Sequence, residues 1–286
     1  MRSNRPPRRE VTVRSASVAA KKYLGQHFLI DQAVLATIVE TAELAPDARV
    51  LEIGPGHGVL TAALADAVPN GLVLAIEKDR ELIEELRERF VSRKHVKIVA
   101  GDILGTPLAT LLTAPYQIVA NIPYAVTSPI ITKFLLGDYR GRAGEASPRP
   151  ESMTLLIQKE VAERLVAEPG QRARGILTVL IELFGSARLV ATVSRGAFDP
   201  PPRVESAVIR IDLGEPQADP HGFLQLLKAG FSAKRRQLHN SLAGSLHLST
   251  AEAKAILERA GINPLLRAEQ LTLGQWLALL VEVQRG

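Results

Sequence analysis

The sequence predicts an α/β protein with an open sheet, followed by a small domain made of helices alone. Three observations predict this class. An apolar strand over 49–53 runs into a glycine-rich turn over 54–58, and an apolar helix follows. Two later apolar strands are followed by acids, Glu77 and Asp102. From about residue 218, apolar residues recur at helical spacing only, so the sheet precedes a helical region.

Composition narrows the function classes. With 286 residues, 46% of them hydrophobic, the chain can bury one large core and a smaller second one. It has no run of about 18 apolar residues and no charged segment leading into an apolar stretch, which argues against membrane insertion and secretion. It has no cysteine, which excludes disulfides, thiolate zinc sites and cysteine nucleophiles. We therefore expect a cytoplasmic protein without a metal site, a monomer by default.

The net charge of +5 is concentrated at the amino terminus. Residues 1–22 hold seven Arg and Lys against the single acid Glu10, and the remaining chain is nearly neutral. Residues 1–20 lack apolar periodicity and are expected to be disordered when free. Three interpretations stay open for this basic arm: contact with a polyphosphate partner, a solubilising tail, or an organelle transit peptide.

The glycine turn and the two acids indicate a ligand site. Gly54 and Gly56 let the backbone approach a ligand closely, although the spacing is G-x-G-x-G and differs from the dinucleotide fingerprint. Glu77, 19 residues beyond Gly58, ends the next strand, where an acid can accept both hydroxyl protons of a ribose. Asp102 could accept from an adenine amino group. Each acid alone also fits an ordinary solvated strand end.

The tetrapeptide Asn121-Ile-Pro-Tyr124 ends an apolar run over 115–120. The exocyclic amine of a nucleobase is a poor nucleophile because its lone pair is delocalised. A site that alkylates it needs acceptors aimed at the N–H bonds and an aromatic face against the base. Asn121, the next carbonyls and Tyr124 can supply both, because Pro123 has no N–H and biases Ile122 toward an extended conformation. The alternative is an ordinary strand-to-loop turn.

In this order, the four strand ends resemble S-adenosylmethionine-dependent methyltransferases of class I, which have a Rossmann-like, seven-stranded mixed sheet. From about residue 20 to the carboxyl end, the chain is similar to the bacterial small-subunit rRNA adenine dimethyltransferases of the KsgA type. The stretches that carry this resemblance are Leu24-Gly-Gln-His-Phe-Leu29, Gln158-Lys-Glu-Val-Ala-Glu-Arg-Leu165, Phe198-Asp-Pro-Pro-Pro-Arg-Val-Glu-Ser206, Phe231-Ser-Ala-Lys-Arg-Arg-Gln-Leu-His-Asn-Ser-Leu242 and Arg267-Ala-Glu269.

The resemblance implies that S-adenosylmethionine is the cofactor. His27 stands where the family often has Asn. If that contact uses the backbone, the change matters little, and if it uses the side chain, His27 could titrate near neutral pH. A surface histidine without a catalytic part is the third possibility. The cofactor-binding residues that the resemblance implies are His27, Leu29, Gly54, Gly56, Glu77, Asp102 and Asn121.

The resemblance also implies how a target adenine is held. Asn121 and the carbonyl of Ile122 would accept the N6 protons. Tyr124 would stack on the base, and Phe198 would form a second aromatic wall. No general base is required, because the attacked nitrogen becomes acidic as it gains a bond. The predicted catalytic group is therefore Asn121, Ile122, Pro123, Tyr124 and Phe198.

We expect a methyltransferase domain over 21–215 and a helical RNA-binding domain over 216–286. The sequence Arg174-Gly-Ile-Leu-Thr178 departs from the Tyr-Gly-Arg-Leu-Ser usual in the family, which puts any family contact of that Tyr or Arg in question. A basic cluster of Lys234, Arg235, Arg236 and His239 could grip the RNA backbone, although a solvated helix face is the alternative. Arg267-Ala-Glu269 fits an internal ion pair or a cap better than an RNA contact.

The predicted reaction is the transfer of two methyl groups to N6 of each of two adjacent adenosines near the 3′ end of 16S rRNA. The partner would be this rRNA within an immature 30S subunit, with a secondary role in ribosome assembly. Two alternatives stay open. One is a 23S rRNA adenine methyltransferase of the macrolide-resistance type, and the other is a non-catalytic assembly factor on the same fold.

Overall fold

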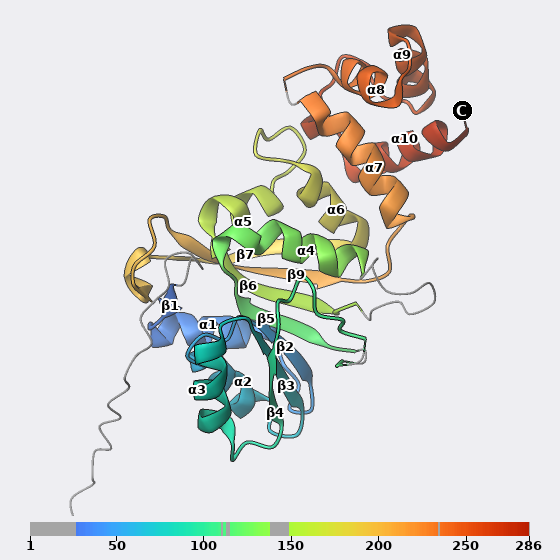
Figure 1. Cartoon of the computed structure of the whole chain (residues 1–286). Helices are drawn as coiled ribbons and strands as arrows, with labels where there is room; N and C mark the ends of the chain where they lie inside the picture. Colours follow the sequence, from blue (N-terminus) through green and yellow to red (C-terminus); the bar gives the residue numbers. More distant parts are fainter. Residues whose placement is uncertain (1–26, 110, 113–114, 138–148, 234, 286) are drawn as a thin grey trace, which may run out of the picture.

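The computed structural model describes residues 27–109, 111–112, 115–137, 149–233 and 235–285 (Figure 1). The basic arm over 1–20 and the stretch Leu24-Gly-Gln lie outside the described residues. In the described part, seven strands form one sheet in the order β4-β3-β2-β5-β6-β9-β7. The first five are parallel, whereas β9 runs antiparallel to both of its neighbours. The predicted mixed, Rossmann-like sheet is confirmed.

The element bounds agree closely with the sequence periodicity. The strands are β1 (Phe28–Leu29), β2 (Arg49–Ile53), β3 (Leu72–Glu77), β4 (Val96–Ala100), β5 (Gln117–Asn121), β6 (Ser152–Gln158), β7 (Gly185–Val193), β8 (Phe198–Asp199) and β9 (Ser206–Leu213). The α-helices are α1 (Gln32–Ala42), α2 (Val59–Ala67), α3 (Arg80–Phe90), α4 (Thr127–Leu136), α5 (Lys159–Leu165), α6 (Ile176–Phe184), α7 (Pro220–Gly230), α8 (Leu238–Leu246), α9 (Thr250–Arg259) and α10 (Leu273–Arg285).

The sheet separates two hydrophobic cores, because successive side chains of a strand point to opposite faces. On β5, Val119 belongs to the core beneath α1 and α2, whereas its neighbours Ile118 and Ala120 belong to the larger core beneath α4 and α6. The same alternation recurs on β6, where Leu156 faces the smaller core. Helices therefore cover both faces of the sheet (Figure 1). Strands buried on both sides explain the near-continuous apolar runs of the sequence.

Helix α1 is positioned by a side-chain cap. Asp31 has an extended backbone, and its carboxylate accepts from the backbone N–H groups of Ala33 and Val34. These bonds satisfy two of the amide groups that a helix start leaves without partners. This N-cap fixes where β1 ends and α1 begins, directly beside the ligand cavity.

The helices after residue 216 share the larger core. Phe223 and Leu227 of α7 belong to the same buried cluster as Val179 of α6, and the cluster continues to Trp276 of α10. The aromatic rings of Phe231 and Trp276 stack with centroids 5.7 Å apart. The helical region is thus packed onto the sheet domain. None of the described helices is long and apolar enough to span a membrane.

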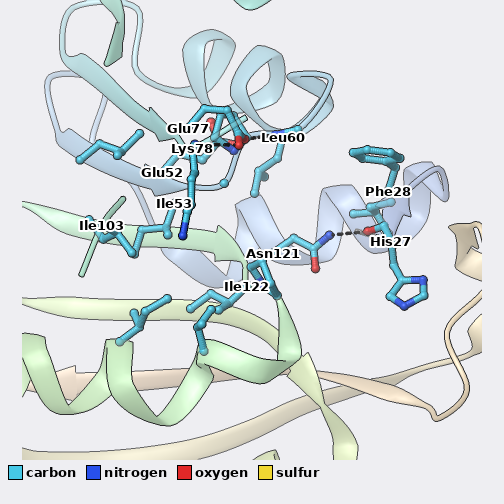
Figure 2. A pocket seen from close by; sticks show the side chains of 18 of the residues that line it. His27, Phe28, Glu52, Ile53, Leu60, Glu77, Lys78, Ile103, Asn121 and Ile122 are labelled. Atoms are coloured by element: carbon cyan, nitrogen blue, oxygen red, sulfur yellow. Dashed lines mark hydrogen bonds between the residues drawn. The ribbon is translucent and has the colours of Figure 1, made fainter. Parts of the chain in front are cut away.

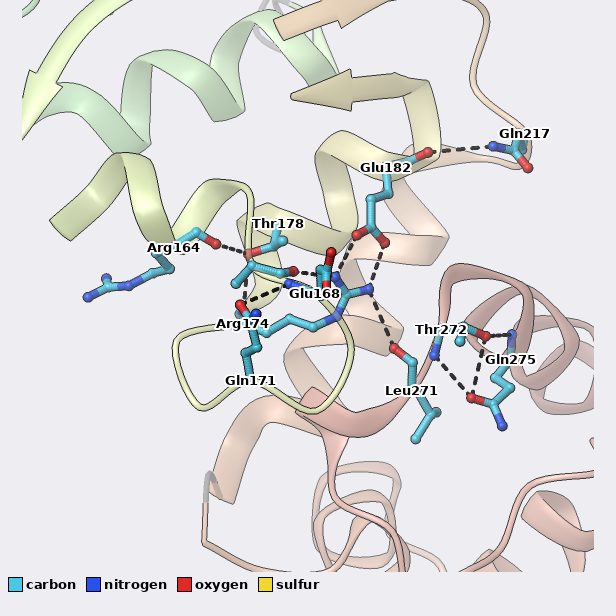
Figure 3. A network of polar contacts seen from close by, with 12 residues as sticks. Arg164, Glu168, Gln171, Arg174, Thr178, Glu182, Gln217, Leu271, Thr272 and Gln275 are labelled. Atoms are coloured by element: carbon cyan, nitrogen blue, oxygen red, sulfur yellow. Dashed lines mark hydrogen bonds and ion pairs between the residues drawn. The ribbon is translucent and has the colours of Figure 1, made fainter. Parts of the chain in front are cut away.

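Arg174 ties these two regions together (Figure 3). Its guanidinium is fully buried and donates to both carboxylate oxygens of Glu182, at 2.5 and 2.6 Å. It also donates to the carbonyl of Ala167 at 2.8 Å and to that of Leu271, between η5 (Ala268–Gln270) and α10, at 3.4 Å. A planar guanidinium suits such forked bonds. The departure from the family pattern at this position therefore places a structural arginine inside the protein.

The strand order fixes where a ligand can bind. The chain builds β2, β3 and β4 outward in one direction and then returns to place β5 on the other side of β2. The connections on the two sides of this point diverge and open a crevice at the carboxyl ends of β2 and β5. The glycine turn follows β2, and the tetrapeptide Asn121-Ile-Pro-Tyr124 begins at the end of β5.

Candidate functional site

A cavity of about 400 Å³ lies at this edge of the sheet (Figure 2). Residues from the ends of four consecutive strands line it: Gly54 after β2, Glu77 ending β3, Asp102 after β4 and Asn121 ending β5. The segment around Phe28 lines it as well. The structure therefore brings the four ligand positions predicted from the sequence into one pocket, of a size typical for small-molecule sites.

The glycine turn requires glycine for two separate reasons. Gly54 and Gly56 have φ values of +67° and +58°, in the left-handed region that favours glycine. A Cβ on Gly56 would also lie 3.0 Å from the ring of Phe28. The ring of Phe28 packs against that of His57, with centroids 4.3 Å apart, and the turn is thus held against β1. Its backbone can approach a ligand that lies in the cavity.

Glu77 is buried, and backbone amides hold its carboxylate. Its Oε1 accepts from the N–H groups of Lys78 and Asp79, both at 2.8 Å, and its Oε2 accepts from the N–H of Gly56 at 3.2 Å. Burial raises the pKa of Glu77 and these three bonds oppose the shift. A carboxylate offers about four acceptor positions, so acceptor capacity is left for a ribose hydroxyl.

Asp102 lies at the rim of the cavity and pairs with Lys78. Lys78 Nζ donates to Asp102 Oδ2 at 2.8 Å, and Oδ1 accepts from the N–H of Leu104 at 3.0 Å. The hydrogen bond from Lys78 lowers the pKa of Asp102, so the group is ionised. The sequence did not predict this ion pair, although Lys78 directly follows Glu77. An adenine amino group would share Asp102 with the lysine.

Glu52 is a cavity residue that the sequence analysis did not single out. It is 1% exposed, and no described residue gives its Oε2 a hydrogen bond. Loss of hydration raises its pKa from 4.5 to about 8; the nearby hydroxyl of Thr61 opposes this shift, and the charge of Glu77 adds to it. The available signal was one acid inside the otherwise apolar strand Val50-Leu51-Glu52-Ile53. A buried acid of this kind is protonated at neutral pH.

Asn121 lines the cavity with its amide oriented by a backbone contact. Its Nδ2 donates to the carbonyl of His27 at 3.2 Å, a contact across 94 residues of chain (Figure 2). The bond engages the donor end of the amide, and Oδ1 is left as an acceptor. Pro123 follows with φ −55° and ψ 128°, and the extended conformation of Ile122 stays a prediction. Ile122 is buried between them.

Tyr124 and His27 form one wall of the outer cavity. Their rings lie 27° from parallel with centroids 5.8 Å apart. The hydroxyl of Tyr124 is 2.6 Å from that of Ser206, at the start of β9, and burial raises the pKa of the phenol. His27 Nδ1 is 2.8 Å from the carbonyl of Pro200, in the loop after Phe198. His27 thus makes contacts through both its backbone and its ring, so both interpretations of this position remain.

Phe198 is placed differently from the expectation of an open aromatic wall. Its side chain is 3% exposed and belongs to the smaller core, and it is not among the described residues that line the cavity. Its backbone pairs with Leu29 in the short antiparallel ladder of β1 and β8. This arrangement holds the loop over 199–205 near His27. Stacking of Phe198 on a base stays a prediction, and it requires the ring to leave this core position.

The basic cluster is only partly described. Arg235 and Arg236 are exposed in the turn before α8, whereas Lys234 lies outside the described residues. His239 does not belong to this surface: it is 5% exposed, and its Nδ1 lies 2.8 Å from the carbonyl of Pro264. The sequence places His239 close to these basic residues and gives no sign that its side chain faces inward. Arg267 starts a capped 3₁₀ turn, in which its N–H donates to Gln270 Oε1 at 2.8 Å.

The fold and the cavity define a Rossmann-like methyltransferase that uses S-adenosylmethionine. The residues present fit this cofactor: a glycine turn that a Cβ would obstruct, an ionised acid at the rim, and a buried acid with an oxygen left without a partner. Among the described residues, no group of three or more potential ligands could hold a metal ion.

Comparison with known proteins gives the family. The model of the family described as ribosomal RNA adenine dimethylase matches residues 18–285. The chain is 40% identical to a ribosomal RNA small subunit methyltransferase A from Dehalococcoides mccartyi, over 91% of this chain and 87% of that protein. This chain belongs to the ribosomal RNA adenine dimethylase family, and it is an S-adenosylmethionine-dependent rRNA methyltransferase.

Two solved structures show the same architecture over almost the whole chain. A dimethyladenosine transferase from Plasmodium falciparum superposes with a TM-score of 0.74 at 26% identity, covering 91% of this chain and 98% of that one. The 23S rRNA methyltransferase ErmE superposes with a TM-score of 0.68 at 29% identity, covering 90% of this chain and 99% of that one. Both likenesses include the helical region after residue 216 as well as the sheet.

Proposed function

We propose that this chain dimethylates N6 of two adjacent adenosines near the 3′ end of 16S rRNA. The single observation that carries the proposal is the orientation of Asn121. Because its Nδ2 is engaged by the carbonyl of His27, its Oδ1 is the end of the amide available to the cavity. An adenine N6 presents two N–H donors, and an oxygen acceptor at this point selects such an amine.

The rest of the base site follows from this orientation. Tyr124 lies beside Asn121 and offers an aromatic face, and its hydroxyl is fixed by Ser206. Stacking of a base on an aromatic side chain is worth about 1–3 kcal/mol. The target base must first leave its own stack, at a cost of a few kcal/mol. The aromatic face of Tyr124, which now lies next to the His27 ring, provides the place for an extruded adenine.

The residues of this chain act mainly by orientation. S-adenosylmethionine, when bound, supplies a methyl group on a sulfonium. Asn121 Oδ1 and the Ile122 carbonyl would accept the N6 protons and turn the nitrogen lone pair toward that methyl. As the nitrogen gains its bond, it becomes acidic, and its proton leaves to water. Correct orientation can contribute about 7 to 11 kcal/mol in favourable cases, and no general base is assigned.

Two findings support the small-subunit target over the large-subunit alternative. Curated relatives named ribosomal RNA small subunit methyltransferase A are about 40% identical over most of this chain, whereas ErmE is 29% identical. The stretches 231–242 and 267–269 resemble the small-subunit type. We further propose that the partner is an immature 30S subunit in the cytoplasm, that the enzyme acts as a monomer, and that its binding contributes to subunit assembly.

The test is methyl transfer from labelled S-adenosylmethionine to undermethylated small subunits and, in parallel, to naked 23S rRNA. Modified nucleosides are identified by mass spectrometry. Dimethyladenosine in the 16S rRNA alone is expected. Product in the 23S rRNA would reassign the chain to the resistance type. Tight subunit binding without product would leave a non-catalytic assembly factor.

A further inference from the structure

Aromatic rings line the cavity at two places. Phe28 and His57 pack against each other beside the glycine turn, with centroids 4.3 Å apart. His27 and Tyr124 face each other at the base end, and Figure 2 shows the rings of His27 and Phe28 on opposite sides of their segment. Phe198 is 3% exposed in the smaller core and is not among the described residues that line the cavity. Within the described structure, His27 is therefore the ring that can face a base held on Tyr124.

The two rings at the base end are nearly parallel, but they are too close for a base to fit between them. Their planes differ by 27° and their centroids lie 5.8 Å apart. A stacked base contacts each neighbour at about 3.5 Å, so two faces that enclose one stand about 7 Å apart. The rings must therefore separate by at least about 1 Å to admit an adenine. Both residues are half-buried, which leaves part of each exposed to an incoming base.

The two rings belong to different structural units, which makes this separation possible. Tyr124 follows β5 of the seven-stranded sheet, and its hydroxyl lies 2.6 Å from that of Ser206 on β9. His27 directly precedes β1, which pairs with β8 in a two-stranded sheet of its own. A shift of about 1 Å between such units is within the range that proteins show on binding. The gap can therefore widen while both sheets stay intact.

Two hydrogen bonds keep His27 at the base end. Its Nδ1 lies 2.8 Å from the carbonyl of Pro200. Because a carbonyl can only accept, the nitrogen donates, and the ring is tied to the loop that follows β8. Pro200 is exposed, so the ring and the loop can move together. The carbonyl of His27 accepts from Asn121 Nδ2 at 3.2 Å, which keeps its backbone beside the acceptor for the target amine.

We propose that the ring of His27 is the second aromatic face of the base site, and that the target adenine stacks between this ring and Tyr124. The inference rests on the proposed methylation of adenine. Histidine is among the side chains on which nucleobases stack. The side chain of His27 thus serves the RNA, whereas its backbone carbonyl orients Asn121. An asparagine here, as the family often has, offers the same carbonyl without a ring, so the second face comes from the residue that this chain has at position 27.

The experiment compares three substitutions of His27 in the full chain. The quantities are kcat/KM for undermethylated small subunits and the dissociation constant of S-adenosylmethionine from calorimetry. His27→Ala and His27→Asn remove the ring, and the asparagine retains an N–H donor. Because a base stacked on one ring is lost, their kcat/KM should fall about 5- to 100-fold. His27→Phe retains the face and loses the donor, and it should restore most of the kcat/KM that His27→Ala loses.

The matched control is His95→Ala. Like His27, His95 contacts a backbone carbonyl through its ring, that of Ala65 at 3.0 Å, but it does not line the cavity. Its kcat/KM should equal that of the native chain. Cofactor affinity should stay close to the native value in all three His27 variants, which also shows that they are folded.

Three outcomes would overturn the proposal. Native kcat/KM in His27→Ala would mean that the ring does not hold the base. Equal losses in His27→Ala and His27→Phe would assign the effect to the bond with Pro200. A loss of cofactor affinity as large as the loss of kcat/KM would assign the ring to the cofactor. Failure of the proposed function is distinguishable, because the native chain itself would then give no dimethyladenosine in 16S rRNA, and the inference would fall with it.

Discussion

The two ends of the cavity are built in different ways. At the cofactor end, residues of neighbouring strand ends hold each other: Lys78 and Asp79 donate their amides to the adjacent Glu77, and the amide of Gly56 reaches it across 21 residues. At the base end, Asn121 contacts His27 across 94 residues and Tyr124 contacts Ser206 across 82. The contacts of Glu77 and Asp102 at the cofactor end therefore join residues at most 24 apart in the chain. The base end exists only after the chain has folded around it.

Because of this difference, we expect cofactor binding and methyl transfer to be lost separately when one end or the other is changed. Backbone amides fixed by the sheet hold the cofactor end, so a change at the base end should leave cofactor binding almost intact. The base end consists of side chains from three segments, and it determines the geometry of attack. Variants at the two ends should affect different steps.

The largest expected effect is on turnover, from Asn121→Ala. Removing the amide oxygen removes the acceptor for the target amine, and loss of one such aimed group costs about 10²- to 10³-fold in rate. Single-turnover methylation of undermethylated small subunits measures this loss. Cofactor affinity, measured by calorimetry, should change by only a few fold. An equal loss in both quantities would contradict the separation of the two ends.

Glu77→Ala should show the reverse pattern. It removes a charged acceptor for the ribose, which is worth about 1.5–3 kcal/mol, and we expect cofactor binding to weaken about 10- to 100-fold. The rate at saturating cofactor should fall much less. Glu84→Ala is the control, because Glu84 is exposed and pairs only with Arg87 within the described structure. A large rate loss at saturation would show that Glu77 also orients the reacting groups.

Glu52, at the cofactor end, should make the free energy of unfolding of the protein depend on pH. Its pKa in the folded chain is about 8, above the ordinary 4.5, so the folded state retains a proton that the unfolded state has lost. Stability should therefore fall as pH rises from about 5 to 8, by at most about 1.4 kcal/mol per pH unit. Urea unfolding of the free protein at several pH values measures this slope. Glu52→Gln should flatten it, and an unchanged slope would assign it to another group.

The smallest effect is expected at the base end, from Tyr124→Phe. This change keeps the ring and removes the hydroxyl contact with Ser206, worth about 0.5–1.5 kcal/mol. Methylation of small subunits should slow less than about tenfold. Ser206→Ala should have a similar effect, and the double variant should add little to either. Fully additive losses would mean that the two hydroxyls act independently.

The sequence was informative where structure is local. The glycine turn and the acid ending β3 depend on neighbouring residues, and the helices after residue 216 follow the helical spacing of their apolar residues. The orientation of the Asn121 amide could not be predicted, because it depends on a backbone carbonyl far away in the sequence. The resemblance to a family supplied the role of this residue, and the structure supplied the contact.

Burial was the property that the sequence hid most completely. Arg174 and His239 are polar residues in loops or helix starts, and only the tertiary packing shows that both are inside. Phe198 lies in the smaller core, although its loop was expected to present it to a base. Glu52 was concealed by its strand, where one acid among apolar residues looks like a solvated position.

The most direct test of this account measures two quantities on the same two variants. Cofactor dissociation constants and single-turnover rates at saturating cofactor are determined for Asn121→Ala and Glu77→Ala with undermethylated small subunits. The account predicts a crossed result, in which Asn121→Ala loses rate with nearly native affinity and Glu77→Ala loses affinity with nearly native rate. Parallel losses in both variants would contradict it, because the cavity would then act as one unit.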